Sequence, residues 1–209
     1  MFRLRRICVV VLSACSLQVI AQTRDVSGYY LTHEKDTVWG KLTIPTRFSS
    51  TEVVDHLINW RVYFRETADS EGMIVTPPEI AGFGFDFQDE HLTYLSVPNV
   101  RRMHNPFGEA NERIFLQSVV SGPVTLLRRP IYEFYAGESI ARQQGGGRTK
   151  GFYEVSEHYF LLVNGEIVDL NGPGWRDQMR RFLDSQTDLA LTRMKRRDIP
   201  AMVYAHVRN

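Results

Sequence analysis

Cysteine is almost absent from this chain of 209 residues, and its distribution is uneven. Both cysteines, Cys8 and Cys15, lie close to the N-terminus, and none follows them. The segment 22–209 therefore contains no disulfide, no thiol nucleophile and no thiolate ligand for a metal. Its stability has to come from the burial of a core, and a chain of this length can bury about 70% of its unfolded surface.

The chain also lacks an excess of charge of one sign. Its 25 basic and 24 acidic residues give a net charge of +1, which argues against a dedicated nucleic-acid-binding protein. A hydrophobic fraction of 43% with 23% charged residues is typical of a globular domain and excludes a disordered chain. We therefore expect a folded domain with no nucleic-acid partner.

No apolar run is long enough to remain in a bilayer, but segment 1–21 has the composition of a secretory signal peptide. Three arginines precede an uncharged run from Ile7 to Ile20, which spans about 21 Å as a helix, against ~30 Å of hydrocarbon. The pattern predicts cleavage between Ala21 and Gln22 and export to the periplasm or the extracellular space. No transmembrane span would remain. A buried N-terminal helix would not account for the clustered arginines.

The stretch Leu12-Ser13-Ala14-Cys15 allows a second interpretation of the N-terminus. It resembles the lipobox of bacterial lipoproteins, in which the cysteine is lipidated and becomes the first residue. Cys15 would then anchor the protein in the outer membrane. Apolar residues continue past the cysteine as far as Ile20, where a mature lipoprotein usually turns polar, so we favour simple secretion.

Segment 22–171 shows the alternation of apolar and polar residues that predicts antiparallel strands. Polar or glycine-containing turns separate these strands, and the last turn is Asn-Gly, the strongest short hairpin signal. The sequence predicts a β-rich body built as a meander, a sandwich or a partial barrel. The clearest alternating stretches are 38–44, 60–65 and 83–87, and the turns are 34–36, 88–90, 121–123 and 164–165.

After Leu170 the apolar spacing changes to that of a helix. Trp175 and Met179 begin an apolar face, a second helical stretch follows Thr187, and Asp198 can cap a third helix. The sequence therefore predicts an α+β fold in which 172–209 is a C-terminal helical segment packed on the body.

One cluster of potential ligands surrounds the expected turn at 88–90. We favour a polar hairpin turn there, with no metal or cofactor; the alternative is a site for Ca²⁺ or a transition metal. The residues concerned are Asp86, Asp89, Glu90 and His91.

No motif for a nucleophile or a nucleotide is present, so we expect a protein that is not an enzyme. A hydrolase acting on an envelope or nutrient polymer is the alternative. Its candidate groups would be Asp86 and His91 together with His104 and Glu109, which lie in a stretch of loop composition.

The segment after Asn171 is basic, with eight basic and four acidic residues. The favoured interpretation is a solvated helix face, and a second alternative is an adaptor that contacts an anionic membrane surface. Its contact residues would be Arg180, Arg181, Lys195, Arg196 and Arg197.

Tyrosine and tryptophan are frequent along the expected strands, for example at Tyr29 and Trp39. These side chains combine a flat apolar face with a polar group, so exposed ones would suit sugar rings or a partner strand. Aromatic residues are also good strand formers, which is the simpler explanation. An envelope component, a glycan or a protein are therefore the partners to consider.

Short motifs occur along the chain, namely Ala21-Gln22, Gly28-Tyr29-Tyr30-Leu31-Thr32 and Asp36-Thr37-Val38-Trp39-Gly40. They continue with Pro78-Glu79-Ile80-Ala81-Gly82-Phe83 and the Asn164-Gly165 hairpin. In these motifs the chain resembles a group of uncharacterised exported proteins of Bacteroidota-type bacteria, with Lys35 where that group usually has glycine. The resemblance implies an envelope or secreted location, no cofactor and no assigned activity. We expect a non-catalytic binding or assembly module of the cell envelope.

The processing hypothesis makes a direct prediction about the mature protein. When the full chain is expressed in a Gram-negative host, intact-mass analysis should give a protein that begins at Gln22, as free or cyclised glutamine. A mass that corresponds to acylated Cys15 would establish lipidation instead. Retention of the first twenty residues in cytoplasmic protein would contradict both interpretations.

Overall fold

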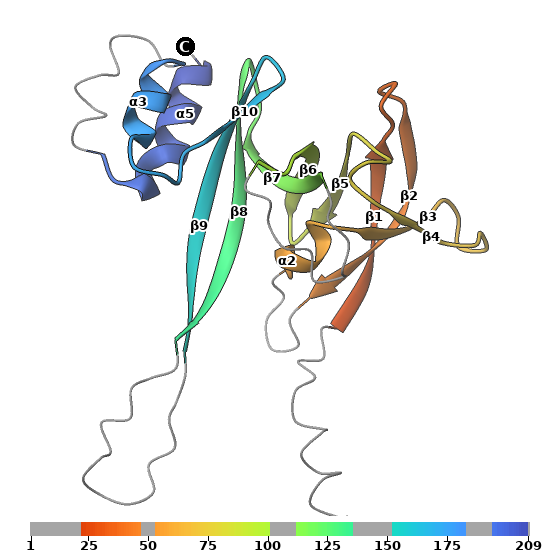
Figure 1. Cartoon of the computed structure of the whole chain (residues 1–209). Coiled ribbons are helices and arrows are strands. Elements are labelled where there is room, and N and C mark those ends of the chain that lie inside the picture. Colours follow the sequence, from red (N-terminus) through yellow and green to blue (C-terminus); the bar gives the residue numbers. More distant parts are fainter. Residues whose placement is uncertain (1–21, 47–52, 101–111, 136–151, 183–193, 209) are drawn as a thin grey trace, which may run out of the picture.

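Ten antiparallel strands form one sheet in the computed structural model (Figure 1), which describes residues 22–46, 53–100, 112–135, 152–182 and 194–208. The expected antiparallel, β-rich α+β fold is confirmed at this level, with a lower helix content than the α+β label suggests. The expected signal segment with Cys15 and most of the second helical stretch lie outside the described residues.

The sheet has the strand order β10-β9-β8-β7-β6-β5-β1-β2-β3-β4. Strands β5 to β10 follow one another as an up-and-down meander, whereas β1 lies between β2 and β5. The strands are β1 (Gln22–Leu31), β2 (Thr37–Thr46), β3 (Val62–Arg65), β4 (Met73–Val75), β5 (Gly82–Phe87), β6 (Glu90–Pro98), β7 (Arg113–Val120), β8 (Val124–Tyr135), β9 (Phe152–Val163) and β10 (Glu166–Asp169).

Side chains along β5 alternate between the core and the outer face, as the sequence predicts. Phe83, Phe85 and Phe87 are buried, and Asp86 is exposed between the last two. The rings of Phe83 and Phe85 stack on Tyr94 of β6, with centroids 4.9 and 6.0 Å away. This aromatic layer forms the centre of the core under β1, β2, β5 and β6.

Two-residue hairpins connect β5 to β6 and β9 to β10. In the second, Asn164 and Gly165 have φ angles of 50° and 84°, the left-handed conformation that the Asn-Gly pair predicts. In the first, Gln88 and Asp89 have φ angles of 51° and 65°, so two residues with side chains adopt the same conformation.

One short helix and the short strand β4 have no counterpart in the sequence prediction. The helix α2 (Asp55–Ile58) is linked to β2 because Val54 N donates to Pro45 O at 2.9 Å. It is linked to β7 because Phe115 N donates to Asn59 O at 2.8 Å. A helix of one turn carries too weak an apolar period to be recognised from sequence.

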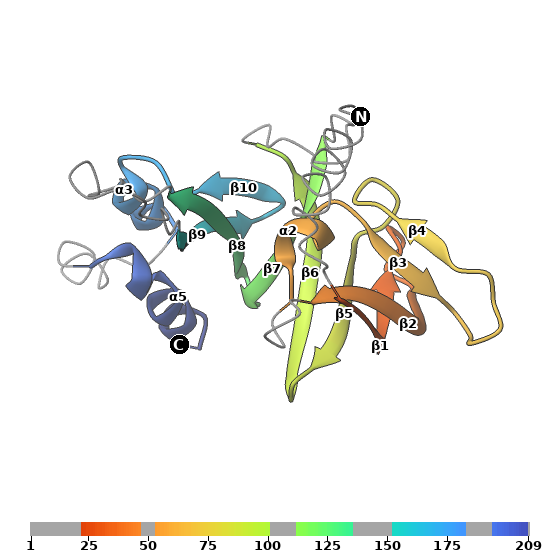
Figure 2. The same ribbon diagram turned by 90° about the horizontal axis from the view of Figure 1, so that it is seen from below.

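The C-terminal helices pack against one end of the sheet, beside β8 to β10 and away from β1 to β4 (Figures 1 and 2). They are α3 (Trp175–Arg180) and α5 (Ile199–Arg208). Trp175 and Met179 are buried, as expected, and share a core cluster with Leu126 and Leu161 of the sheet. Within the described part of the chain, no helix combines the length and the hydropathy that crossing a bilayer requires.

Asp198 acts one turn earlier than its expected role as a helix cap. It ends a 3₁₀ turn (Arg196–Asp198), and its carboxylate accepts a hydrogen bond from Lys195 N at 2.9 Å. The helix α5 then begins at Ile199, with Pro200 in its first turn, where its missing N–H costs nothing.

The turn between β1 and β2 gives a test of backbone strain. Lys35 has a φ angle of 71°, in the region where a side chain costs about 1 kcal/mol or more. We expect Lys35→Gly to raise the free energy of unfolding by about 0.5–1 kcal/mol, as measured by urea denaturation. The adjacent exposed Glu34 is not among the positive-φ residues, so Glu34→Gly should lower stability. Equal losses in both variants would contradict this account.

Candidate functional site

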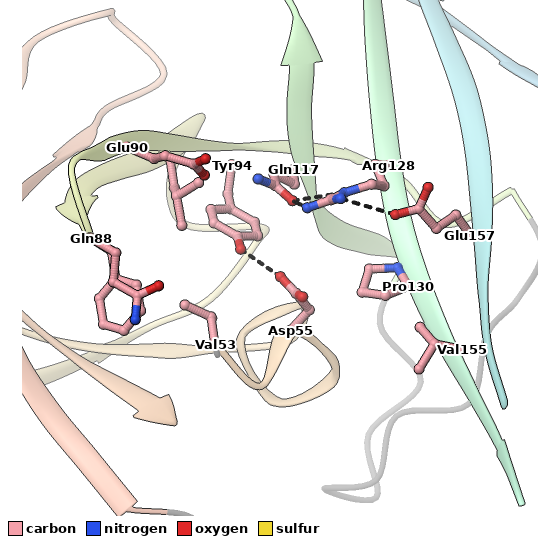
Figure 3. A pocket seen from close by; sticks show the side chains of 12 residues that line it. Val53, Asp55, Gln88, Glu90, Tyr94, Gln117, Arg128, Pro130, Val155 and Glu157 are labelled. Atoms are coloured by element: carbon pink, nitrogen blue, oxygen red, sulfur yellow. Dashed lines mark hydrogen bonds and ion pairs between the residues drawn. The ribbon is translucent and has the colours of Figure 1, made fainter. Parts of the chain in front are cut away.

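A pocket of about 420 Å³ opens between the core side of β5 to β9 and the segment around α2 (Figure 3). Apolar and aromatic side chains line part of it, and polar side chains reach it from α2 and from β6 to β9. The lining residues are Val53, Asp55, Phe87, Gln88, Glu90, Leu92, Tyr94, Gln117, Arg128, Pro130, Val155 and Glu157.

A buried hydrogen bond joins α2 to the sheet at one side of the pocket. Tyr94 OH donates to Asp55 Oδ1 at 2.6 Å, and both side chains are buried. A carboxylate in this position needs such donors, because desolvating an unpaired charge is very costly. The bond therefore fixes both the Asp55 carboxylate and the Tyr94 ring at the pocket wall.

A second polar cluster lies next to Tyr94 on the same face of the sheet, on β7, β8 and β9, because Gln117 pairs with Tyr94 and Arg128 pairs with Gln117. Arg128 Nε donates to Gln117 Oε1 at 3.0 Å, and Arg128 Nη1 donates to Glu157 Oε1 at 3.0 Å. Tyr159 OH donates to the other oxygen of Glu157. Each side chain in this cluster is held by at least one neighbour, so its geometry is set before any ligand arrives.

Burial raises the pKa of Tyr159 well above the ordinary value of 10. The hydrogen bond to Glu157 and the negative charge of that carboxylate act in the same direction, and Arg128 opposes them. The phenol thus stays protonated and keeps donating to Glu157 at neutral pH.

Carboxylates outnumber cations in the pocket lining. Asp55, Glu90 and Glu157 contribute three acidic groups, and Arg128 is the one basic group among the lining residues. The guanidinium of Arg128 is already engaged by Gln117 and Glu157. The pocket is therefore a poor site for an anion and a good one for neutral or cationic polar groups.

Two of the sequence-predicted site residues meet, but outside this pocket. His91 Nδ1 lies 2.7 Å from Asp86 Oδ1 on the outer face of β5 and β6, and both side chains are largely exposed. Their turn neighbour Glu90 lines the pocket on the other face of the sheet. His104 and Glu109 lie outside the described residues.

The four residues of the proposed metal cluster are not gathered at one point. Asp86 and His91 face each other across the hairpin, and Glu90 lines the pocket, whereas Asp89 lies in the turn itself. No group of three or more His, Cys, Asp or Glu side chains suited to a metal ion is found among the residues that the structure describes.

Several of the basic C-terminal residues bond to their own neighbours. Arg180 Nη1 lies 2.6 Å from Asp177 Oδ1, and Arg196 Nη2 donates to the Asn171 carbonyl at 2.6 Å. Arg197 Nε lies 3.7 Å from Asp198 Oδ1. These contacts use part of the charge that an anionic surface would require.

The pocket residues Asp55, Gln117, Arg128 and Glu157 were missed as site residues by sequence reasoning. A usable signal was present at two of them, since Asp55 and Gln117 each interrupt an apolar stretch. A polar residue at a core-facing position requires a hydrogen-bond partner. Ligand pockets are lined by a few polar groups of this kind, so such a residue is a candidate for a site.

Comparison with protein-family models, with curated proteins and with solved structures finds no match. The function of the pocket has to be argued from its own chemistry.

The raised pKa of Tyr159 predicts how stability depends on pH. Above pH 10 the unfolded chain loses the phenolic proton while the folded protein keeps it, so this group makes the free energy of unfolding fall as pH rises. We expect the stability advantage of the wild type over Tyr159→Phe to shrink between pH 9 and pH 11 in urea denaturation. A constant difference across that range would contradict the assignment.

Proposed function

We propose that this protein is an exported, non-catalytic binding module of the bacterial cell envelope. Its pocket would hold a saccharide unit that is neutral or carries an amino group. The observation that carries the proposal is the set of hydrogen-bonded polar side chains, Asp55, Gln117, Arg128 and Glu157, arranged around one apolar and aromatic hollow.

The chemistry of the walls matches a polyhydroxylated ring. Carboxylate oxygens of Asp55 and Glu157 accept hydrogen bonds from hydroxyl or amino groups, and the Gln117 amide can donate as well as accept. Phe87 and Leu92 offer apolar surface to the C–H faces of such a ring. A purely apolar ligand would leave the remaining acceptor sites of these carboxylates without a donor.

Export is supported by the composition of segment 1–21. A saccharide ligand is consistent with that location, because glycans are abundant in a bacterial envelope. The basic C-terminal segment supports membrane contact less well, since Arg180, Arg196 and Arg197 already have partners.

A binding role fits the pocket better than hydrolysis does. The carboxylate of Asp55 accepts from Tyr94, and that of Glu157 accepts from Arg128 and Tyr159, so both are committed to holding the site together. The pair Asp86 and His91 lies on an exposed face, where no walls would position a substrate or exclude water.

The charge of the pocket gives a selective test with three soluble probes. Saturation-transfer NMR of the chain 22–209 should detect glucose and glucosamine, and should detect glucuronate far more weakly, because carboxylates repel it. Asp55→Asn keeps an acceptor for Tyr94 OH, and Glu157→Gln keeps one for Tyr159 OH. Each should weaken glucosamine binding about fivefold or more, the loss of one charge-assisted hydrogen bond.

Glu166→Gln is the matched control, since it removes an exposed carboxylate at the start of β10, outside the pocket lining. It should bind like the wild type. Preferential binding of glucuronate, or equal losses in the control and the pocket variants, would overturn the proposal. Release of reducing ends from an envelope polymer would establish the hydrolase instead.

A further inference from the structure

Three rings form an exposed row on the outer face of the sheet, away from the pocket. Trp39 of β2 lies directly opposite Tyr29 of β1, and their ring centroids are 5.0 Å apart. The Tyr29 ring stacks on His91 of β6 at 5.9 Å, with an interplanar angle of 14°. We call Trp39, Tyr29 and His91 the ring platform.

The ring platform crosses β5 at a glycine. Gly84 pairs with Tyr29, and a Cβ atom at Gly84 would lie 2.6 Å from Tyr29 OH and 2.7 Å from the ring carbon that bears it. Real Cβ atoms do not approach that closely, so only glycine lets the tyrosine lie across β5 and reach His91. A side chain at this position would displace the ring.

Hydrogen bonds hold the rings of Tyr29 and His91 in place. Asp86 Oδ1 lies 2.7 Å from His91 Nδ1, and His91 Nε2 lies 3.3 Å from Tyr29 OH. If Nδ1 carries the proton it donates to Asp86, and Nε2 can accept from the phenol. A surface whose rings are fixed in advance loses little entropy when a ligand binds.

Trp39 of the ring platform is far more exposed than the other tryptophans of the chain. Trp39 is 67% exposed, whereas the other two tryptophans, Trp60 and Trp175, are 2% and 6% exposed. The carboxylate of Asp86 and the ring of His91 are likewise open, with side-chain exposures of 81% and 51%. A tryptophan contributes most when it is covered, so this position favours a ligand over a role in stability.

We propose that the ring platform binds a saccharide chain along its row of rings. Centroids 5.0 and 5.9 Å apart are spaced by about one sugar unit, and the 58° tilt between Trp39 and Tyr29 suits a chain whose successive pyranoses are turned relative to one another. The surrounding polar groups suit their hydroxyls. Ser27 and Lys41 pair beside the row, with Asp86 on the same side, and Thr93 lies opposite Gly84 on the other side. The core of a protein–protein interface is depleted of charged residues, whereas Lys41 and Asp86 lie beside these rings.

This inference goes beyond the pocket and stands on separate residues. The pocket lies on the core side of β5 and β6, and the ring platform lies on the outer side of the same strands. The two sites can therefore succeed or fail independently. A chain that lies on the platform would place a glycan on one face while the pocket takes a single unit on the other.

Tryptophan fluorescence provides a direct measure of saccharide binding to the ring platform. A β-1,4-linked glucose tetrasaccharide and a β-1,4-linked N-acetylglucosamine tetrasaccharide are titrated into the chain 22–209, and acrylamide quenching of fluorescence is measured. Only Trp39 is open to the quencher, so at least one of the two saccharides should protect it. Trp39→Ala and Tyr29→Ala should each weaken binding about tenfold, measured by isothermal titration calorimetry.

Gly84→Ala tests the geometry without removing a ring. It should weaken binding as Tyr29→Ala does, while circular dichroism confirms that the variant is folded. Tyr204→Ala removes another exposed aromatic side chain, on α5, and should leave binding unchanged. Asp55→Asn should leave tetrasaccharide protection of Trp39 unchanged, which separates this result from the pocket.

Three outcomes would overturn the proposal. The first is no protection of Trp39 by either tetrasaccharide at millimolar concentration. The second is a saccharide affinity that is unchanged in Trp39→Ala. The third is protection of Trp39 that rises with protein concentration in the absence of saccharide, which would identify the platform as a contact between copies of the chain.

Discussion

The two-residue turn at Gln88 and Asp89 fixes which side chains of β5 and β6 face the core. Because successive residues of a strand point to opposite faces, a shift of one residue would exchange the two sets completely. With Phe87 paired to Glu90, the phenylalanines of β5 and Tyr94 face inward, and Asp86 and His91 face outward. Both proposed sites depend on this one register.

Polar side chains that face the core need hydrogen-bond partners, which the tertiary structure has to supply. Asp55 and Gln117 are buried, and each would be strongly destabilising without a partner. Tyr94 donates a hydrogen bond to Asp55, and Arg128 donates one to Gln117. Tyr94, Gln117 and Arg128 are in register on the neighbouring strands β6, β7 and β8, so their polar groups form one row on the face of the sheet that lines the pocket.

On the outer face of the sheet, a glycine in β5 lets an aromatic ring lie across the strand. Gly84 leaves a gap in the surface of β5, and Tyr29 fills that gap by lying across the strand toward His91. The arrangement protects the glycine backbone and brings rings from three strands into one row. These rings carry the second of the two proposed sites.

Local signals allowed much of the sheet to be predicted. The alternation of Phe83, Phe85 and Phe87 and the Asn164-Gly165 turn are short-range patterns, and the structure contains the strands and hairpins they predict. The helix at Asp55 and the strand β4 escaped prediction because each is too short to show a period. The meeting of Asp86 and His91 was foreseeable, since they pair across one turn.

By itself, the sequence determined the cysteine-free body, the antiparallel strands and the turns that join them, because these follow from composition and from residues close together in the chain. Only the tertiary structure decided the two sites. Asp55 and Tyr94 are 39 positions apart, and Tyr29 and His91 are 62 apart. No local pattern encodes such contacts, since they depend on the order in which the strands assemble in the sheet and on the close approach that Gly84 permits.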